Sequence, residues 1–363
     1  MILFVLHRMH PNLHQVEKAL IDSGRECVFV VSEIGPSEPA DKPERIRMNP
    51  KTSTHAEIQE FMEKLKPEVL IQRNFSHQFT SFWQIARASQ IPRFRYSQDP
   101  QQIPFRDLFV RPLRVVRLSR DIIRFRLILG PHKVVTPVMY WGLPGSHDFK
   151  NVCYLPFPAP QADLVEKRST EVLTVLCVAK HGQRRKRVHW LLKALSRSDT
   201  VFRLQFVGAR PGETEFFRQK WHRFILRSAR ELGERANLVS FHYDLTQEET
   251  STLYGSADLF VLPSNREMMA ISPLEAMSHG LPVLVASDGG AVGYVRPVGE
   301  EQIFKARSFR SFRSSLSRLL AEEGLRLRLA EAASLSITTT HSPQSFLVKV
   351  ERALRSDVAV EEH

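Results

Sequence analysis

Two glutamates separated by seven residues are the first candidates for chemistry. Glu267 and Glu275 lie in the stretch SNREMMAISPLEAMSHG, and each follows a serine by three positions. Ser272-Pro-Leu-Glu275 is a capping-box pattern with proline at the favoured first helical position, so a structural role alone could explain Glu275. Pro273 limits any helix that begins at Ser264 to about one or two turns. Glu267 therefore lies on a loop after an expected strand, and no local pattern gives it a structural task.

Two lysines form a second candidate group. Lys180 and Lys186 lie in CVAKHGQRRKRVHWLLKAL, between an expected strand and an expected helix. Cations near a helix N-terminus can neutralise an anion such as a diphosphate. The alternative is a basic surface turn, because Arg184, Arg185 and Arg187 are neighbours.

Short apolar runs alternate with amphipathic stretches and must position these side chains. Strands are expected in the first half at 2–6, 27–31, 67–72, 92–97, 133–138 and 151–155, with helices at 13–24, 55–65 and 81–89. Strands are expected in the second half at 171–179, 202–208, 237–241, 258–264 and 282–287, with helices at 189–196, 213–233, 247–256 and 273–280. This alternation is typical of parallel sheets covered by helices, in which ligands bind beyond the carboxyl ends of the strands.

The chain length and one proline-rich stretch predict two domains. A chain of 363 residues exceeds one ordinary core, and LPFPAPQADLVEKRST at 155–170 interrupts the alternation like a linker. We expect doubly wound α/β domains at 1–160 and 161–341, facing each other across a cleft. A last helix within 342–363 is expected to return to the first domain.

Composition restricts the partners and the compartment. The net charge of +12 favours polyanions, anionic membranes or phosphorylated small molecules. The three cysteines are far apart, which argues against a disulfide framework and favours a reducing compartment. No Asp-x-Asp or histidine spacing indicates a metal site, and no apolar run is long enough to span a membrane. We expect a cytoplasmic protein, with peripheral attachment to the inner face of the membrane as an open alternative.

A basic segment from Arg106 to Arg126 contains much of the excess charge. Seven arginines lie in it, and Arg117, Arg120 and Arg124 share one helical face. A solvated helix face explains the pattern, as does a docking surface for anionic lipid or a phosphorylated acceptor. Nucleic acid is a weaker interpretation, because no aromatic residues alternate with the arginines.

Fourteen spaced positions resemble the donor-binding signature of the family 4 glycosyltransferases, which have the GT-B fold. The matching positions are Tyr254, Ala257, Asp258, Pro263, Ser264, Glu267, Glu275, Ala276, Met277, Gly280, Pro282, Val283, Gly289 and Gly290. Lys180 and Lys186 are also similar to the family's phosphate-binding segment. The good match covers about 172–290, and the N-terminal half matches only in architecture.

The resemblance implies a role for each candidate. Lys180 and Lys186 would bind the diphosphate of a UDP- or GDP-linked sugar, Glu275 the ribose and Glu267 the transferred hexose. Glu267 and Lys186 would be the catalytic pair. Backbone N–H groups of the loop would add to the donor site at Met269, Ala270 and Ile271. The resemblance implies no cofactor and no metal, an N-terminal domain that binds the acceptor, and a C-terminal domain that binds the nucleotide sugar.

The chain departs from the family pattern at three places. Met268-Met269-Ala270 replaces the usual Gly-Phe-Gly, and HRMHPNLHQ replaces the glycine pair after the first strand. No histidine ends the central N-terminal strand. The remaining polar candidates for the acceptor side are His7, Arg8, His10, Gln98 and Asp99.

The resemblance implies transfer of a hexosyl unit, with retained anomeric configuration, to a hydroxyl of a glycan or lipid-linked anionic acceptor. Cell-surface polysaccharide or glycolipid biosynthesis is the expected setting. Two alternatives stay open: a non-catalytic binding or scaffold protein on a degenerate GT-B fold, and a sugar-nucleotide epimerase of the same fold.

Overall fold

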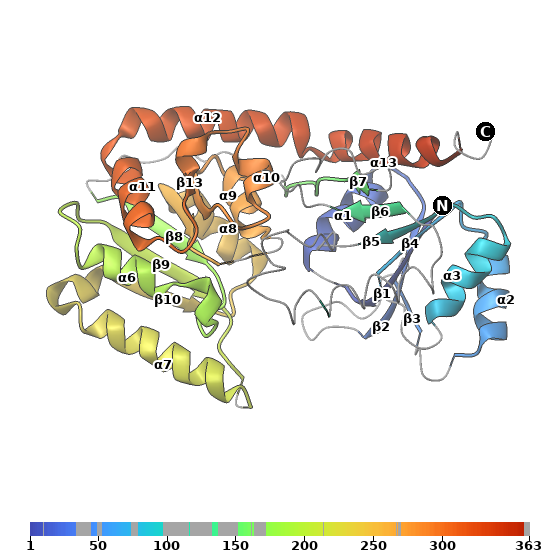
Figure 1. Cartoon of the computed structure of the whole chain (residues 1–363), viewed down its shortest axis with the longest axis horizontal. Coiled ribbons are helices and arrows are strands. Elements are labelled where there is room, and N and C mark those ends of the chain that lie inside the picture. Colours follow the sequence, from blue (N-terminus) through green and yellow to red (C-terminus); the bar gives the residue numbers. More distant parts are fainter. Residues whose placement is uncertain are drawn as a thin grey trace. The chain divides into compact units, whose positions relative to one another are not determined.

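The chain divides into two compact α/β units (Figure 1). The computed structural model describes residues 1–9, 11–33, 45–48, 53–73, 79–96, 116, 133–136, 152–160, 162, 172–212, 214–265, 267 and 270–358. Unit 1 comprises Met1–Val138, Gly142–Pro158 and Pro343–His363, and unit 2 comprises Met139–Trp141 and Ala159–Ser342. The sequence-based prediction of two parallel α/β domains is confirmed.

Unit 1 contains a parallel sheet in the order β3-β2-β1-β4-β5-β6-β7 among its described residues. Its strands are β1 (Ile2–Arg8), β2 (Cys27–Glu33), β3 (Arg45–Arg47), β4 (Val69–Gln72), β5 (Arg93–Tyr96), β6 (Lys133–Thr136) and β7 (Val152–Tyr154). Its helices are α1 (Pro11–Asp22), α2 (His55–Leu65), α3 (Phe79–Ala88) and α13 (Pro343–Val358).

Helices cover both faces of this sheet because β1 is apolar on both sides. Leu3 and Val5 belong to the core cluster with Phe82 and Trp83 of α3. The alternate residues Ile2 and Phe4 line a small cavity on the other face, together with side chains of α1 and α13. Near-continuous apolar strands are typical of parallel sheets that are buried on both faces.

The first residues of the expected linker belong to this second core. Phe157 is only 3% exposed, and Leu155 and Phe157 line the same cavity as Phe346 of α13. The two units divide between Pro158 and Ala159, within the expected linker. Its first apolar side chains nevertheless pack on the sheet of unit 1.

Unit 2 contains a sheet in the order β10-β9-β8-β11-β12-β13 (Figure 1). Its strands are β8 (Thr174–Val178), β9 (Arg203–Gly208), β10 (Val239–Tyr243), β11 (Leu259–Leu262), β12 (Val283–Ala286) and β13 (Ile303–Phe304). Its α-helices are α6 (His189–Leu195), α7 (Phe216–Arg230), α8 (Gln247–Ser256), α9 (Ser272–Ser278), α10 (Val292–Val295), α11 (Phe309–Ala321) and α12 (Glu323–Thr340). Short 3-10 turns occur at η1 (Arg184–Lys186), η2 (Gly233–Leu238) and η3 (Glu300–Gln302).

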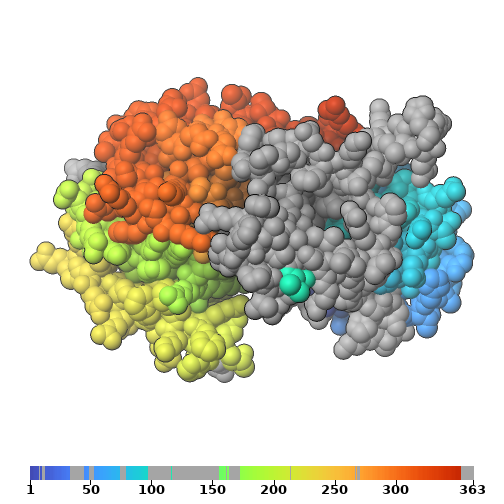
Figure 2. Space-filling model, in the orientation of Figure 1, coloured from blue at the N-terminus to red at the C-terminus, as the bar shows by residue number. Residues whose placement is uncertain are grey.

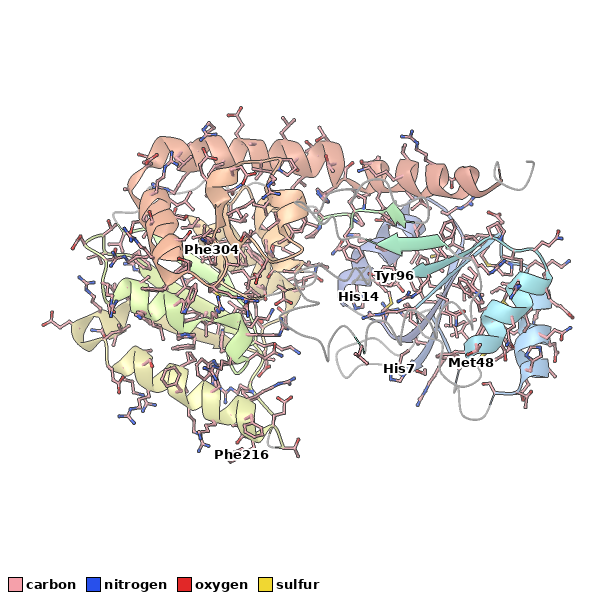
Figure 3. The ribbon with its side chains drawn as sticks, in the orientation of Figure 1. His7, His14, Met48, Tyr96, Phe216 and Phe304 are labelled. Carbon is pink, nitrogen blue, oxygen red and sulfur yellow. The ribbon has the colours of Figure 1, made fainter. Side chains whose placement is uncertain are left out.

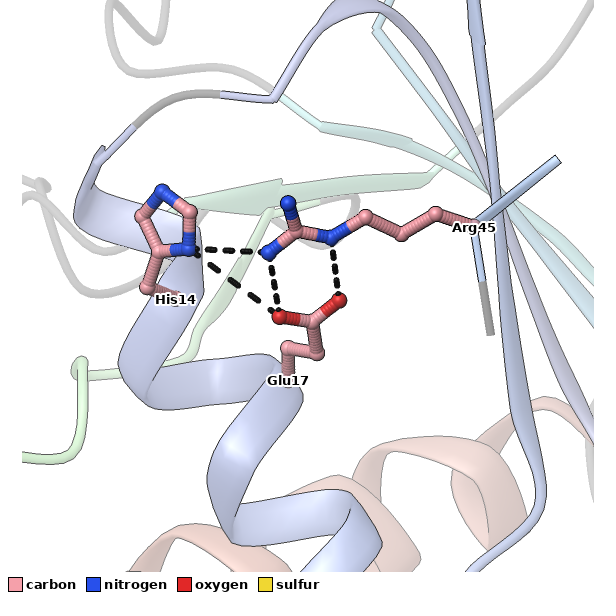
Figure 4. Close-up of polar contacts among 3 residues, drawn as sticks. All are labelled: His14, Glu17 and Arg45. Carbon is pink, nitrogen blue, oxygen red and sulfur yellow. Dashed lines mark hydrogen bonds and ion pairs between the residues drawn. The ribbon is translucent and has the colours of Figure 1, made fainter. Parts of the chain in front are cut away.

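A buried ion pair fixes the edge strand of unit 1 to its first helix. Arg45 of β3 donates two hydrogen bonds to Glu17 of α1, at 2.7 and 2.6 Å. Both side chains are almost fully buried, and His14 of α1 lies 3.0 Å from the same guanidinium (Figures 3 and 4). This contact acts together with the packing of Ile46 against the core and the pairing with β2 to hold the sequence Arg-Ile-Arg of β3 at the sheet edge.

Candidate functional site

The candidate site lies beyond the carboxyl ends of β8 and β11, which are neighbours in the sheet of unit 2. The connection from β8 to α6 contains Lys180 and Lys186, and the connection from β11 to α9 contains Glu267. The carboxyl ends of adjacent parallel strands meet at one edge, so the topology brings these two loops together.

Lys186 and Glu267 form the centre of this site. The Lys186 ammonium lies 2.5 Å from Glu267 Oε2, and both side chains are only about one-eighth exposed. Arg185 donates to the same oxygen at 2.6 Å and is about half exposed. Burial lowers the pKa of Lys186, and the negative charge of Glu267 opposes this shift. The carboxylate therefore helps to keep Lys186 charged in a partly dehydrated position.

Backbone hydrogen bonds hold the Glu267 loop from two sides. The Asn265 N–H donates to the Arg185 carbonyl at 2.8 Å, which joins the loop to η1. The Gly290 N–H donates to the Glu267 carbonyl at 2.8 Å, which joins it to the segment after β12. The prediction that Glu267 has no structural task is incomplete, because its side chain and backbone connect three segments.

A buried histidine anchors the other loop. His181 is fully buried and packs edge-on against Phe206 of β9 and Phe241 of β10, with ring centroids 5.6 and 5.8 Å apart. Burial lowers its pKa to about 4, so the ring is neutral near pH 7. Lys180, the preceding residue, is exposed. The anchor therefore fixes the backbone from which Lys180 extends into solvent.

Lys186 lies in a separate turn and not at the start of a helix. It ends η1, and Arg187 follows with a left-handed φ of 51°. The next helix, α6, begins only at His189. The left-handed Arg187 therefore separates Lys186 from α6, whose start at His189 agrees with the helix expected at 189–196.

Glu275 is bound by a tyrosine instead of capping a helix. The N-cap of α9 is Ile271, no side chain caps this helix, and Ser272 is already helical, so the capping-box prediction is wrong. Tyr254 of α8 donates its hydroxyl to Glu275 Oε2 at 2.9 Å. Burial raises the pKa of Glu275, and the tyrosine hydrogen bond opposes that shift.

Residues close to β8 connect the two parts of the site. Cys177 of β8 is buried, which raises the pKa of its thiol to about 12, and the Lys186 charge opposes that rise. Burial and then the charge of Glu275 raise the pKa of Tyr254 well above its ordinary value, and α8, which carries Tyr254, packs against β8. Lys186 and the Tyr254–Glu275 pair therefore both lie close to β8.

Residues 164–335, which include all of these side chains, match the family model for glycosyl transferases group 1. Over these residues unit 2 is similar to a group 1 glycosyltransferase domain.

Shorter segments of the chain are similar to curated glycosyltransferases. A segment of 95 residues is 36% identical to the D-inositol 3-phosphate glycosyltransferase of Salinispora arenicola, covering 26% of this chain and 21% of that protein. Another of 101 residues is 31% identical to the N,N'-diacetylbacillosaminyl-diphospho-undecaprenol alpha-1,3-N-acetylgalactosaminyltransferase of Campylobacter jejuni, covering 28% of this chain and 27% of that protein. The sequence matches thus span about a quarter of these curated relatives.

The whole chain is similar in fold to a solved glycosyltransferase from Rickettsia africae ESF-5, with a TM-score of 0.74 at 15% identity, covering 98% of this chain and 97% of that chain. Anabaena HepE in complex with UDP-glucose gives a TM-score of 0.70 at 12% identity, covering 98% of this chain and 99% of that chain. The fold of this chain is GT-B, as the sequence signature predicted.

Two residues of the site and one contact were not predicted from the sequence. The sequence indicates Arg185 only as part of a basic turn, yet it shares the Glu267 carboxylate with Lys186. Tyr254 belongs to the signature, but its contact with Glu275 is not local in sequence. Tyr294 donates to the carbonyl of Ala270 at 2.5 Å and supports the loop before α9. No sequence signal indicated Tyr294.

The structure describes some of the other predicted site residues and not the rest. Ala270 is buried, and Ile271 lies directly before α9. His7 and Arg8 end β1 in unit 1, and His7 Nδ1 lies 2.5 Å from Ser32 Oγ of β2. Four predicted site residues lie outside the described part of the chain: Met269, His10, Gln98 and Asp99. The basic segment 106–126 also lies outside it, apart from Val116.

The described residues contain neither a cluster of metal-binding side chains nor a membrane-spanning helix. No group of three histidine, cysteine or acidic side chains is arranged there to hold a metal ion. No described helix combines the length and the apolar character that crossing a bilayer requires. Metal independence itself stays a prediction.

Proposed function

We propose that this chain is a retaining, metal-independent glycosyltransferase that moves a hexosyl unit from a UDP- or GDP-linked sugar to a hydroxyl acceptor. The observation that carries the proposal is the partly buried Lys186–Glu267 pair at the carboxyl ends of β8 and β11. A nucleoside diphosphate leaves as an anion, and a positioned cation lowers the free energy of that charge in a water-poor site. Lys186 supplies this charge, with Lys180 as a second, more exposed cation.

The two carboxylates suit the two sugars of such a donor. Glu267 can accept hydrogen bonds from hydroxyls of the transferred hexose while it keeps contact with Lys186. Glu275 can accept from the vicinal hydroxyls of a ribose, as an acidic residue does in dinucleotide folds. The UDP-glucose in the HepE structure supports this class of donor.

Transfer itself needs positioning more than a protein nucleophile. We propose that the departing phosphate oxygen takes the acceptor proton on the same face of the sugar, which retains the anomeric configuration. The acceptor is a glycan or a lipid-linked anionic molecule, as the diphospho-undecaprenol in one relative's name suggests. Assembly of cell-surface polysaccharide or glycolipid in the cytoplasm, beside the inner membrane face, is the proposed setting.

Nucleotide release across a panel of UDP- and GDP-sugars tests the proposal, with a membrane lipid extract supplied as acceptor. We expect the wild type to consume one donor, and Glu267→Gln to lower kcat/KM about 10²–10³-fold without loss of fold. Glu234→Gln is the matched control, because Glu234 is an exposed glutamate on η2. Absence of release from every donor would contradict the proposal, and unfolding of the Glu267 variant would make that residue structural.

A further inference from the structure

Helix α7 of unit 2 presents a surface that the proposed reaction does not use. The helix runs from Phe216 to Arg230 with the sequence FFRQKWHRFILRSAR, which contains four arginines, one lysine and no acidic residue. Ile225 and Ala229 are its buried residues. The helix lies beside α6, and its outer side forms part of the surface of unit 2 in Figure 2, where it is yellow.

The outward face of α7 combines exposed phenylalanines with cations. At about 100° per residue, six side chains fall within an arc of about 120°. They are Phe216, Phe217, Lys220, Arg223, Phe224 and Arg227. All six are exposed, and Ile225 projects from the opposite side of the helix. We call this arc the α7 face.

The phenylalanines of the α7 face remain in contact with solvent in the isolated chain. Phe217 is 84% exposed, Phe216 62% and Phe224 45%. Phe216 is labelled at the end of α7 in Figure 3. A contiguous apolar patch with a polar rim is typical of an interaction site, whereas single exposed apolar residues are common on any surface.

Part of the positive charge on this face has no acidic partner nearby. Arg218 pairs with Glu215 before the helix, and Arg227 pairs with Glu231 after it at 2.8 Å. Lys220 and Arg223, in the middle of the helix, have no ion pair with any residue in the described part of the chain. They are therefore available to an external anion.

We propose that the α7 face docks on a bilayer surface that contains anionic phospholipid. Phenylalanines inserted at the boundary between headgroups and acyl chains, with lysine and arginine beside them at the phosphates, form the pattern of an interfacial helix. A nucleic-acid duplex would neutralise Lys220 and Arg223 but would leave Phe216 and Phe217 in water, so lipid matches both properties of the face. The α7 face belongs to a different part of the sequence from the basic segment 106–126, and the inference does not depend on the proposed transfer reaction.

Co-sedimentation of the full chain with vesicles, without any donor, tests the inference. We expect the wild type to bind vesicles of equal parts phosphatidylglycerol and phosphatidylcholine, and to bind phosphatidylcholine alone much more weakly. Phe216→Gln with Phe217→Gln should lower the partition coefficient about tenfold or more at unchanged unfolding temperature, because buried apolar area and charge attraction act together. Lys220→Glu with Arg223→Glu should lower the partition coefficient by a similar factor at low salt. The difference from the wild type should disappear at high salt, because salt screens the attraction between these cations and anionic lipid.

The matched control replaces two equally exposed apolar residues on another helix of unit 2. Leu327 and Leu335 of α12 are 65% and 63% exposed, and their replacement by glutamine should leave vesicle binding unchanged. All these variants keep the 106–126 segment intact. Wild-type binding by both α7 variants would overturn the proposal, as would binding of the wild type to a nucleic-acid duplex in place of anionic vesicles.

Discussion

A single carboxylate oxygen of Glu267 accepts from both Arg185 and Lys186. Removing one partner of such a partly buried pair leaves the other charge without compensation, which costs more free energy than an exposed pair does. A diphosphate that reaches Lys186 would replace part of this compensation. The pair therefore keeps the lysine charged and in place until an anion arrives.

Glu275 should make unit 2 less stable as the pH rises. Burial raises its pKa in the folded state, so folding favours the protonated form. This contribution to stability is complete below the unfolded pKa and is lost as the pH rises through the folded pKa. Glu275→Gln keeps an acceptor for Tyr254 without the charge, so we expect a higher unfolding temperature than the wild type at pH 8.

Unfolding temperatures measured at two pH values distinguish the cost of the buried Glu275 charge from loss of the hydrogen bond with Tyr254. At pH 4 the wild-type carboxyl is largely protonated, and the advantage of Glu275→Gln in thermal unfolding should shrink. Tyr254→Phe removes the hydrogen bond at every pH and should destabilise throughout. A glutamine variant that is less stable than the wild type at both pH values would refute a charge penalty at this position.

At the scale of elements, close backbone contact between β8 and β9 positions the Lys180 loop. A Cβ atom added to Gly208 would lie 2.2 Å from the Ala179 carbonyl oxygen, so one backbone would have to move. We expect Gly208→Ala to lower the free energy of unfolding of unit 2 by about 1–3 kcal/mol, measured by urea denaturation. It should also weaken donor binding, because Ala179 precedes Lys180.

A second glycine provides the control for Gly208. Gly324 lies in α12, and a Cβ there would meet no atom within 4 Å. Gly324→Ala should be neutral or stabilise the helix by up to about 1 kcal/mol. Equal effects of the two substitutions would show that the β8–β9 contact is not tight.

The Glu17–Arg45 pair should be essential to the edge of unit 1. Glu17→Gln would leave Arg45 buried with an incomplete partner, and we expect a loss of about 3–5 kcal/mol in the urea unfolding transition of this unit. Replacing both residues by methionine should cost less than the single change, because no charge remains buried. A double variant as unstable as Glu17→Gln would contradict this account.

At the scale of the whole molecule, the sequence predicts the strands of the two sheets better than it predicts the contacts between side chains. The buried apolar runs of β4, β8, β11 and β12 were all predicted. The three-residue strand β3 was missed because its charged sequence pairs with β2 and with Glu17, 28 residues away. The missed partners of the site have the same cause, since 82 residues separate Arg185 from Glu267.

The site also shows where a local pattern misleads. Ser272-Pro-Leu-Glu275 has the spacing of a capping box, but the hydroxyl of Tyr254 binds the glutamate and the helix begins one residue earlier than that pattern requires. The spaced family signature identified Glu267, Glu275 and Lys186 as site residues, because it samples several loops at once. The direct contact of Lys186 with Glu267 required the folded chain.

The central claim is that Lys186 binds the diphosphate and Glu267 the sugar of the donor, and calorimetric titration with nucleoside diphosphates and nucleotide sugars tests it most directly. The proteins compared are the wild type, Lys186→Met, Glu267→Gln and Lys193→Met. Lys193→Met is the charge-matched control, because Lys193 is exposed on α6. We expect Lys186→Met to bind both ligand types about 10–100-fold more weakly, because one charge-assisted contact to phosphate is lost. Glu267→Gln should bind the bare diphosphate at least as well as the wild type, since Lys186 no longer pairs with Glu267, but should lose the extra affinity for the sugar-linked form. Unchanged affinities in Lys186→Met, or a wild type that binds no UDP or GDP ligand, would contradict the account.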